Sequence, residues 1–120
     1  MKLTMNRDEL TITLDRDGTK LTVELAGRLD TSTSPELEAE LKPVLPGITE
    51  LVMELSKLDF ITSAGLRVLL MAAKAMKKQG EMTVMNPNSD VMDIFHVTGF
   101  DSILNIQSDH TSIEAEESSC

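Results

Sequence analysis

The first regular pattern along the chain is a strict alternation of apolar and polar residues in two short segments. Leu10-Thr-Ile-Thr-Leu14 alternates, and Leu21-Thr-Val-Glu-Leu25 repeats the pattern after the turn signal Asp17-Gly18. A period of two is typical of strands that are buried on one face only. Asp-Gly between two such segments favours a tight hairpin turn. The pattern therefore predicts an antiparallel hairpin over residues 10–25.

A helix and a second kind of strand are predicted after the hairpin. Ser34-Pro35 supplies an N-cap followed by proline at the first helical position. Pro46-Gly47 ends this helix, and Pro43 can shorten or bend it. Residues 48–55 then carry the continuous apolar run Leu51-Val-Met53. Such a run is typical of a strand that is buried on both faces, as in a sheet covered by helices.

Three or four further elements are predicted in the second half of the chain. A helical spacing of apolar residues, from Leu66 to Met76, predicts a helix from about Ser63 to Gln79. Residues 82–85 form a short strand in this prediction, and residues 103–106 are a candidate edge strand. Between them a third helix is expected, with Asn88 or Ser89 as its N-cap and Gly99 as its end.

This order of elements predicts an α/β fold. Strand–helix–strand units join parallel strands by right-handed crossovers, whereas the initial hairpin is antiparallel. We therefore expect one domain over residues 1–120, with a mixed central β-sheet and helices packed against it. The segment from about residue 108 to residue 120 is polar and acidic, and we expect a frayed or disordered tail there.

Charge narrows the classes of partner. The net charge is -9, from 20 acidic and 11 basic residues. Direct nucleic-acid binding is disfavoured, because it requires cations that neutralise phosphates, and an anionic membrane surface is disfavoured for the same reason. A basic patch on a protein partner would be attracted instead. The alternative, that the acidity only keeps the protein in solution, stays open.

The sequence offers little to an enzyme or a metal site. Cys120 is the only cysteine, so an intramolecular disulfide is excluded, and His96 and His110 each stand without ligand spacing. Neither a phosphate-binding glycine loop nor a nucleophile–base pair is recognisable, so we expect no catalysis, no metal and no cofactor. Without a signal peptide or an apolar stretch of membrane-spanning length, a cytoplasmic location is expected.

The most informative stretch joins the apolar strand to the second helix. Residues 58–67 read LDFITSAGLR, and the helix should begin at Thr62 or Ser63. A hydroxyl at a helix N-terminus can accept a phosphate, because free N–H groups and the helix dipole stabilise the added charge. From spacing alone, an ordinary N-cap is the more common role for Ser or Thr at this position.

Two motifs, in the same order and spacing, give the chain a resemblance to STAS domains over nearly its whole length. The family pattern Gly-x-Leu-Asp is met by Gly27-Arg28-Leu29-Asp30. The pattern Phe-Met-Asp-Ser-Ser-Gly-Leu is met by Phe60-Ile-Thr-Ser-Ala-Gly-Leu66. The chain is most similar in these motifs to the bacterial anti-sigma-factor antagonists. Their phosphorylated serine lies two positions before the glycine, which corresponds to Ser63.

Two departures from the pattern bear on this assignment. Thr62 replaces the usual aspartate before the serine, and Ala64 replaces the serine after it. The lost aspartate removes a negative charge beside the switch. Thr62 also carries a hydroxyl of its own, so it is the alternative phosphoacceptor.

The resemblance implies a partner switch without catalysis by this chain. The unphosphorylated protein would bind an anti-sigma factor with a histidine-kinase-like ATPase fold and serine kinase activity, which frees the sigma factor. Phosphorylation at Ser63 would release this protein from the anti-sigma factor, and a metal-dependent serine phosphatase would restore the unphosphorylated form. The implied partner surface consists of these residues: Asp30, Thr31, Thr62, Ser63, Ala64, Gly65 and Arg67.

Several alternatives remain at this point. Asp30 is equally compatible with a simple turn residue, and Arg67 with a solvated helix residue. The alternative function is that of a non-catalytic STAS subunit in another assembly, such as a lipid-transport complex or a stress-sensing scaffold.

Overall fold

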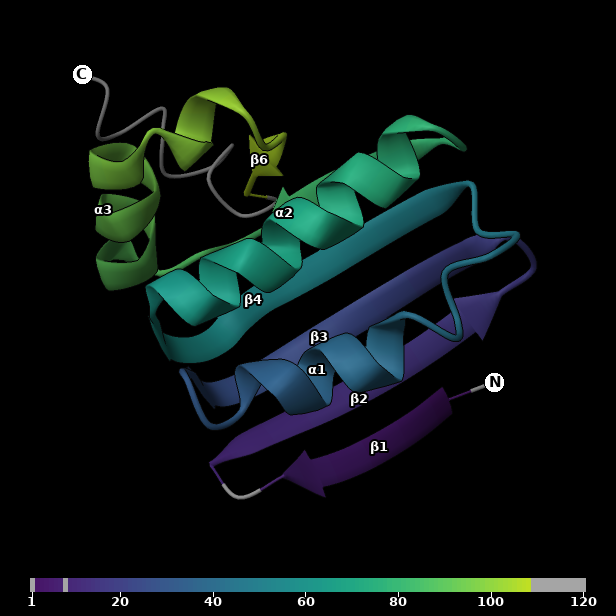
Figure 1. Ribbon diagram of the computed structural model, residues 1–120, viewed down its shortest axis with the longest axis horizontal. Coiled ribbons are helices and arrows are strands. Elements are labelled where there is room, and N and C mark those ends of the chain that lie inside the picture. Colours follow the sequence, from purple (N-terminus) through teal and green to yellow (C-terminus); the bar gives the residue numbers. More distant parts are fainter. Residues whose placement is uncertain (1, 8, 109–120) are drawn as a thin grey trace.

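The computed structural model describes residues 2–7 and 9–108, and within them the chain forms a mixed six-stranded sheet with three α-helices (Figure 1). The first three strands, β1 (Lys2–Arg7), β2 (Leu10–Asp17) and β3 (Lys20–Leu29), pair antiparallel. The next strands, β4 (Glu50–Ile61), β5 (Glu81–Met85) and β6 (Ile106–Gln107), continue the sheet parallel to β3. This confirms the predicted α/β class and the mixed sheet.

The strand order follows the chain order, β1-β2-β3-β4-β5-β6. Helices α1 (Ser34–Leu41), α2 (Ser63–Lys77) and α3 (Ser89–Thr98) connect the four parallel strands, and a 3-10 turn at Phe100–Ser102 follows α3. Crossovers of one hand that all step in one direction place their helices on one face of a sheet. Figure 1 shows α1 and α2 side by side on that face, and α3 beyond the end of the sheet.

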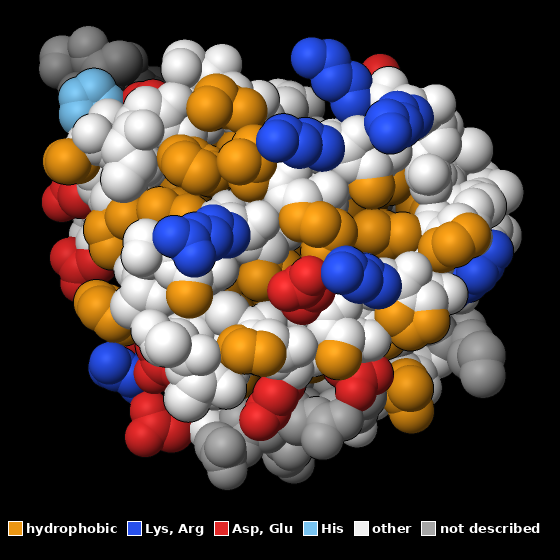
Figure 2. Space-filling model, viewed as in Figure 1, with side chains coloured by type: hydrophobic (Ala, Val, Ile, Leu, Met, Phe, Trp, Pro, Cys, Tyr) orange, Lys and Arg blue, Asp and Glu red, His pale blue; other side chains and the backbone are white. Residues whose placement is uncertain are grey.

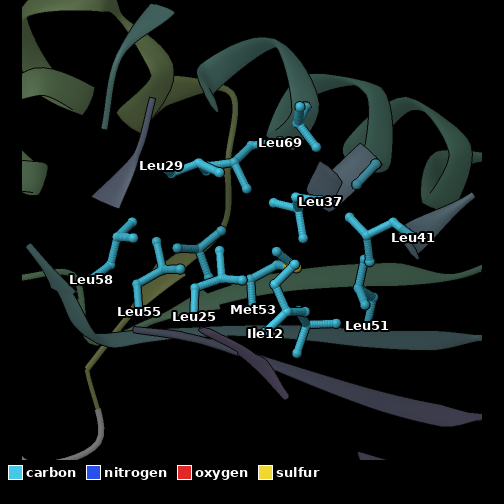
Figure 3. Packing of buried hydrophobic residues seen from close by; sticks show 14 of the residues in the cluster. Ile12, Leu25, Leu29, Leu37, Leu41, Leu51, Met53, Leu55, Leu58 and Leu69 are labelled. Atoms are coloured by element: carbon cyan, nitrogen blue, oxygen red, sulfur yellow. The ribbon is translucent and has the colours of Figure 1, made fainter. Parts of the chain in front are cut away.

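The core lies between the sheet and the first two helices. Alternate residues of β2, β3 and β4 point toward the helices and are buried, among them Ile12, Leu25 and Met53. Leu37 and Leu41 of α1 meet Leu29 of β3 and Leu69 of α2 in the same cluster (Figure 3). Almost every large buried side chain is aliphatic, as the composition requires.

The opposite face of the sheet carries polar side chains. Thr13, Thr22, Glu24 and Glu54 alternate with the core residues and are half-buried, and Thr4 bonds Thr13 across β1 and β2. Among the described residues no helix covers this face. The prediction that the strand over residues 48–55, which is β4 in the structure, is buried on both faces is therefore wrong. Its continuous apolar run is interrupted at Glu54, and Val52 lies on the half-buried face.

The structure also corrects several boundaries. β1 was not predicted from the sequence, and its Leu3 is exposed. α1 ends at Leu41, since Pro43 stops it before Pro46, and its N-cap is Thr33 rather than Ser34. β4 extends to Ile61, well beyond the predicted end.

Other terminal details follow the sequence closely. α2 begins at Ser63, as predicted, and ends two residues before the expected Gln79. The Asn88 side chain accepts a hydrogen bond from the Val91 N–H and caps α3, and Gly99 ends that helix in the left-handed conformation. The edge strand forms at Ile106–Gln107 rather than over residues 103–106. The predicted tail lies outside the described residues from Asp109 onward.

Candidate functional site

The two motif segments meet because β3 and β4 end together. Leu29 of β3 is in register with Ile61 of β4, and the Thr62 N–H donates to the Leu29 carbonyl oxygen at 3.0 Å. Asp30 and Thr62 therefore follow the ends of two neighbouring strands and lie at the same end of the sheet. The topology brings the first residues of the α1 loop to the start of α2.

Asp30 organises a tight turn before α1. Its Oδ1 accepts hydrogen bonds from the Ser32 hydroxyl at 2.8 Å and from the N–H groups of Ser32 and Thr33 at 3.0 and 3.1 Å. These bonds lower the pKa of the Asp30 carboxyl below its usual value, and the bond from the Ser32 hydroxyl has the largest effect. The turn role predicted as one alternative for Asp30 is thus present in the structure.

We expect the Ser32→Ala variant to raise the pKa of Asp30 toward its ordinary value of 3.8, because the first cause of the shift is removed. A carboxyl with a lowered folded-state pKa stabilises the fold above its unfolded pKa. That stabilisation is lost as the pH falls through the folded value. Titration of the Asp30 carboxyl carbon by NMR between pH 2 and pH 6 measures the shift. Ser102→Ala, at an exposed serine beyond α3, is the matched control, and an unchanged Asp30 titration in Ser32→Ala would contradict the assignment.

Arg28 completes this end of the sheet and was not singled out from the sequence. Its guanidinium lies over the Phe60 ring, 4.6 Å from the ring centroid. Its Nε lies 3.2 Å from a carboxylate oxygen of Glu9 and 3.7 Å from Oδ2 of Asp30. Arg28 and Phe60 are paired across β3 and β4. The alternation of side chains along two paired strands is the signal that could have placed them together.

The two motif glycines have packing roles. Gly27 adopts φ +111° at an irregularity in the pairing of β3 with β4, where a side chain would be strained and would also meet the Glu9 backbone. Gly65 lies in the first turn of α2 and is buried. A Cβ at this position would lie 2.8 Å from side-chain carbons of both Leu29 and Ile61. Gly65 is therefore buried beneath the predicted partner surface, and its lack of a side chain lets α2 approach the sheet closely.

The two hydroxyl residues at the start of α2 differ sharply in accessibility. Ser63 is the first residue of the helix and is exposed. Thr62 is the N-cap in an extended conformation, but its Oγ1 is buried, makes no capping bond and has no hydrogen-bond partner among the described residues. The first helical bond runs from the Leu66 N–H to the Thr62 carbonyl oxygen. The N–H groups of residues 63–65 consequently have no acceptor in the described part of the chain.

A groove of about 420 Å³ lies between α1 and α2. Thr31 precedes α1, and Ala64 and Arg67 belong to α2; all three line the groove. Glu38 of α1 and Met71 of α2 also line it, and the sequence did not single them out. Ala64, Arg67 and Met71 recur at helical spacing, which is the signal that could have placed them on one face.

Of the predicted surface residues, Thr31, Ala64 and Arg67 line the groove. Ser63 directly precedes Ala64 in the sequence. Asp30 lies behind Thr31 as the support of the turn, half-buried.

Residues 2–7 and 9–108 contain no group of three or more His, Cys, Asp or Glu side chains that could hold a metal ion. His110 and Cys120 lie outside that part of the chain. None of the described helices is long and apolar enough to span a bilayer.

Comparison with known proteins gives this site a family. The family model described as "Mlab, STAS domain" matches residues 12–106. The chain belongs to the STAS-domain family. Among its relatives is BtrV of Bordetella bronchiseptica, named as a candidate anti-sigma factor antagonist. It is 37% identical over 94 residues, which cover 77% of this chain and 81% of the relative. The anti-sigma-B factor antagonist of Bacillus subtilis is 29% identical over 85 residues, 70% of this chain and 78% of the relative.

Solved STAS structures share the fold. An anti-sigma factor antagonist from Mycobacterium paratuberculosis superposes with a TM-score of 0.76 at 24% identity, covering 85% of this chain and 88% of that one. The anti-sigma factor antagonist SpoIIAA in its unphosphorylated form gives a TM-score of 0.71 at 17% identity, with coverage of 89% and 96%. At this level of identity the likeness concerns the fold, and it confirms the STAS-like architecture.

Proposed function

We propose that this protein is an anti-sigma-factor antagonist that is switched by phosphorylation of Ser63. The observation that carries the proposal is the exposed Ser63 side chain at the first position of α2, directly before Ala64, which lines the α1–α2 groove. The 37% identical relative named as a candidate antagonist supports the class of partner, an anti-sigma factor. SpoIIAA, which shares the fold, has been solved in a phosphorylated form.

A phosphate on Ser63 suits the local electrostatics. The open N–H groups of residues 63–65 and the positive end of the α2 dipole face an anion at this position. Arg67 lies one helical turn further on and is exposed, within the i,i+4 spacing that lets side chains interact. The modified residue can therefore be accommodated without rearrangement of the helix.

The difference in accessibility supports Ser63 over Thr62 as the acceptor. A kinase must bring the γ-phosphate of ATP into line with the hydroxyl oxygen. The Thr62 Oγ1 is buried, so its phosphorylation would require the helix start to open. Ser63 needs no such opening, since its side chain is exposed.

The proposed partner is an anti-sigma factor with a histidine-kinase-like ATPase fold, which acts on Ser63 as a serine kinase. In that step the Ser63 oxygen displaces ADP from the γ-phosphorus of ATP and its proton passes to a base of the kinase. A metal-dependent serine phosphatase would transfer the phosphoryl group to water and restore the hydroxyl. ATP and metal belong to these partners, and this chain acts as their substrate, without catalysis of its own, as one domain in the cytoplasm.

We expect transfer from radiolabelled ATP by the cognate kinase to be abolished in Ser63→Ala and to persist in Thr62→Val. Valine keeps the shape of threonine and removes a buried hydroxyl that has no hydrogen-bond partner among the described residues, so this variant should keep the fold. Phosphopeptide mapping of the wild-type chain then locates the label.

Label retained in Ser63→Ala and lost in Thr62→Val would assign the switch to Thr62 instead. If the wild-type chain neither binds nor accepts phosphate from such a kinase, the proposal fails. The alternative of a non-catalytic STAS subunit in another assembly would then be favoured.

A further inference from the structure

Helix α2 has a cationic outer surface on an otherwise acidic protein. The net charge of the chain is -9, yet residues 63–77 contain no Asp or Glu. Arg67, Lys74, Lys77 and Lys78 are all exposed, and their spacing places them along one side of the helix. In Figure 2 blue side chains follow the course of α2 with orange side chains between them, whereas red side chains gather below and to the left.

These cations form no ion pair in the described part of the chain. No ion pair joins Arg67, Lys74, Lys77 or Lys78 to any residue within 2–7 and 9–108, whereas Lys20, Lys42 and Lys57 each pair with a glutamate. Leu70 and Met71 lie between Arg67 and Lys74 and are half-buried. We call the set Arg67, Leu70, Met71, Lys74, Lys77 and Lys78 the α2 stripe. Its chemistry fits an anionic segment with an apolar anchor.

A groove beside the α2 stripe leads toward the end of the described chain. It has a volume of about 370 Å³ and lies between α2 and the connection before β6. Leu70, Lys74 and Lys77 line one side, and Ile103 and Asn105 line the other. Ile103 is 58% exposed and therefore leaves apolar surface available at this groove. The groove is therefore apolar at its base and cationic at its rim.

The segment that follows has the complementary composition and sufficient length. Residues 109–120 contain Asp109, Glu114, Glu116 and Glu117, no Lys or Arg, and one large apolar residue, Ile113. They follow Ser108, which bonds Asn86 beside the edge strand β6. An extended chain of this length spans up to about 40 Å, whereas the fifteen residues of α2 extend about 22 Å. The segment, when extended, is thus longer than α2 itself.

We propose that residues 109–120 bind in cis along the α2 stripe, with Ile113 in the groove against Leu70 and Ile103 and the glutamates against the lysines. A tethered segment has a high effective concentration at a nearby site, so weak contacts are sufficient for it to bind there. Arg67 belongs both to the α2 stripe and to the α1–α2 groove. Bound in this way, the acidic segment competes with a partner for the surface beside Ser63, whether or not Ser63 is the phosphoacceptor.

Cys120 provides the test without any engineering, because it is the only cysteine. A nitroxide attached to Cys120 of the full isotope-labelled chain should selectively reduce the amide signals of α2, compared with the ascorbate-reduced sample. The loss should be relieved in Lys74→Gln/Lys77→Gln/Lys78→Gln and at 1 M salt, where screening extends to about 3 Å. The matched variant Lys20→Gln/Lys42→Gln/Lys57→Gln, with the same change of charge elsewhere, should keep the loss.

Three outcomes would overturn the inference. The first is that the α2 amide signals of the spin-labelled wild-type chain equal those of the reduced sample. The α2 stripe would then be a surface for a partner in trans. The second is a loss that survives neutralisation of the α2 lysines. The third comes from mixing isotope-labelled Cys120→Ser chain with spin-labelled chain that carries no isotope. A loss on α2 in that mixture as strong as in the single-chain sample would make the occupant a second copy.

Discussion

Replacing Ser63 with aspartate is expected to weaken binding to the anti-sigma factor by at least about tenfold, which corresponds to about 1.4 kcal/mol. The side chain at this position is exposed and directly precedes Ala64, which lines the α1–α2 groove. A negative charge there must be desolvated when the groove is covered, and it meets any acidic group of the partner at short range. Isothermal titration calorimetry with the purified anti-sigma factor gives the change in Kd directly.

Two variants separate charge from size in this experiment. Ser63→Asn matches aspartate in volume without the charge, and Ser63→Ala removes the hydroxyl. We expect Ser63→Ala to bind like the unmodified chain and Ser63→Asn to lose far less affinity than Ser63→Asp. Equal losses in Ser63→Asn and Ser63→Asp would show that bulk, rather than charge, disrupts the complex. Affinity in Ser63→Asp equal to that of the wild type would contradict the phospho-switch.

The second large effect is expected where the two motifs pack against each other. Leu29 is fully buried, and its Cγ lies 2.8 Å from the position that a Cβ on Gly65 would take. Leu29→Ala should lower the free energy of unfolding by about 2–5 kcal/mol, because it removes buried methyl groups and leaves a cavity. Gly65→Ala should lower it by about 1–3 kcal/mol, because the added methyl overpacks the same space. Urea denaturation measures both values.

The double variant makes the packing explanation specific. If the Leu29 side chain is what excludes a Cβ at position 65, Gly65→Ala should cost much less in the Leu29→Ala background. Alanine is favoured over glycine in a helix by about 1 kcal/mol, so the change could even stabilise that background. Two independent losses that simply add would show that the glycine serves another purpose.

Much of this fold is encoded in local patterns that the sequence displays directly. The alternation from Leu10 to Leu25 predicts the hairpin because one face of those strands is buried and the other is not. The polar turn before Ser63 predicts the start of α2, and Asn88 predicts the start of α3. In each case the signal lies in neighbouring residues, so no tertiary information is needed.

The remaining features depend on contacts between distant residues. β1 is defined by its pairing with β2. The run Leu51-Val-Met53 cannot reveal whether a second layer covers Val52, since that depends on which side the crossover helices take. The α1–α2 groove and the stacking of Arg28 on Phe60 likewise arise from the register of β3 and β4.

The attachment of Ser63 to the core has a kinetic consequence. Thr62 is tied to the Leu29 carbonyl, Ile61 is buried, and Gly65 is clamped against both strands. Ser63 therefore follows a segment that is held by backbone and core contacts, and the proposed signal is stored there as a covalent bond. The response time of the proposed switch is then set by phosphoryl transfer, hydrolysis and partner dissociation. The phosphorylated state then lasts as long as the phosphoester survives.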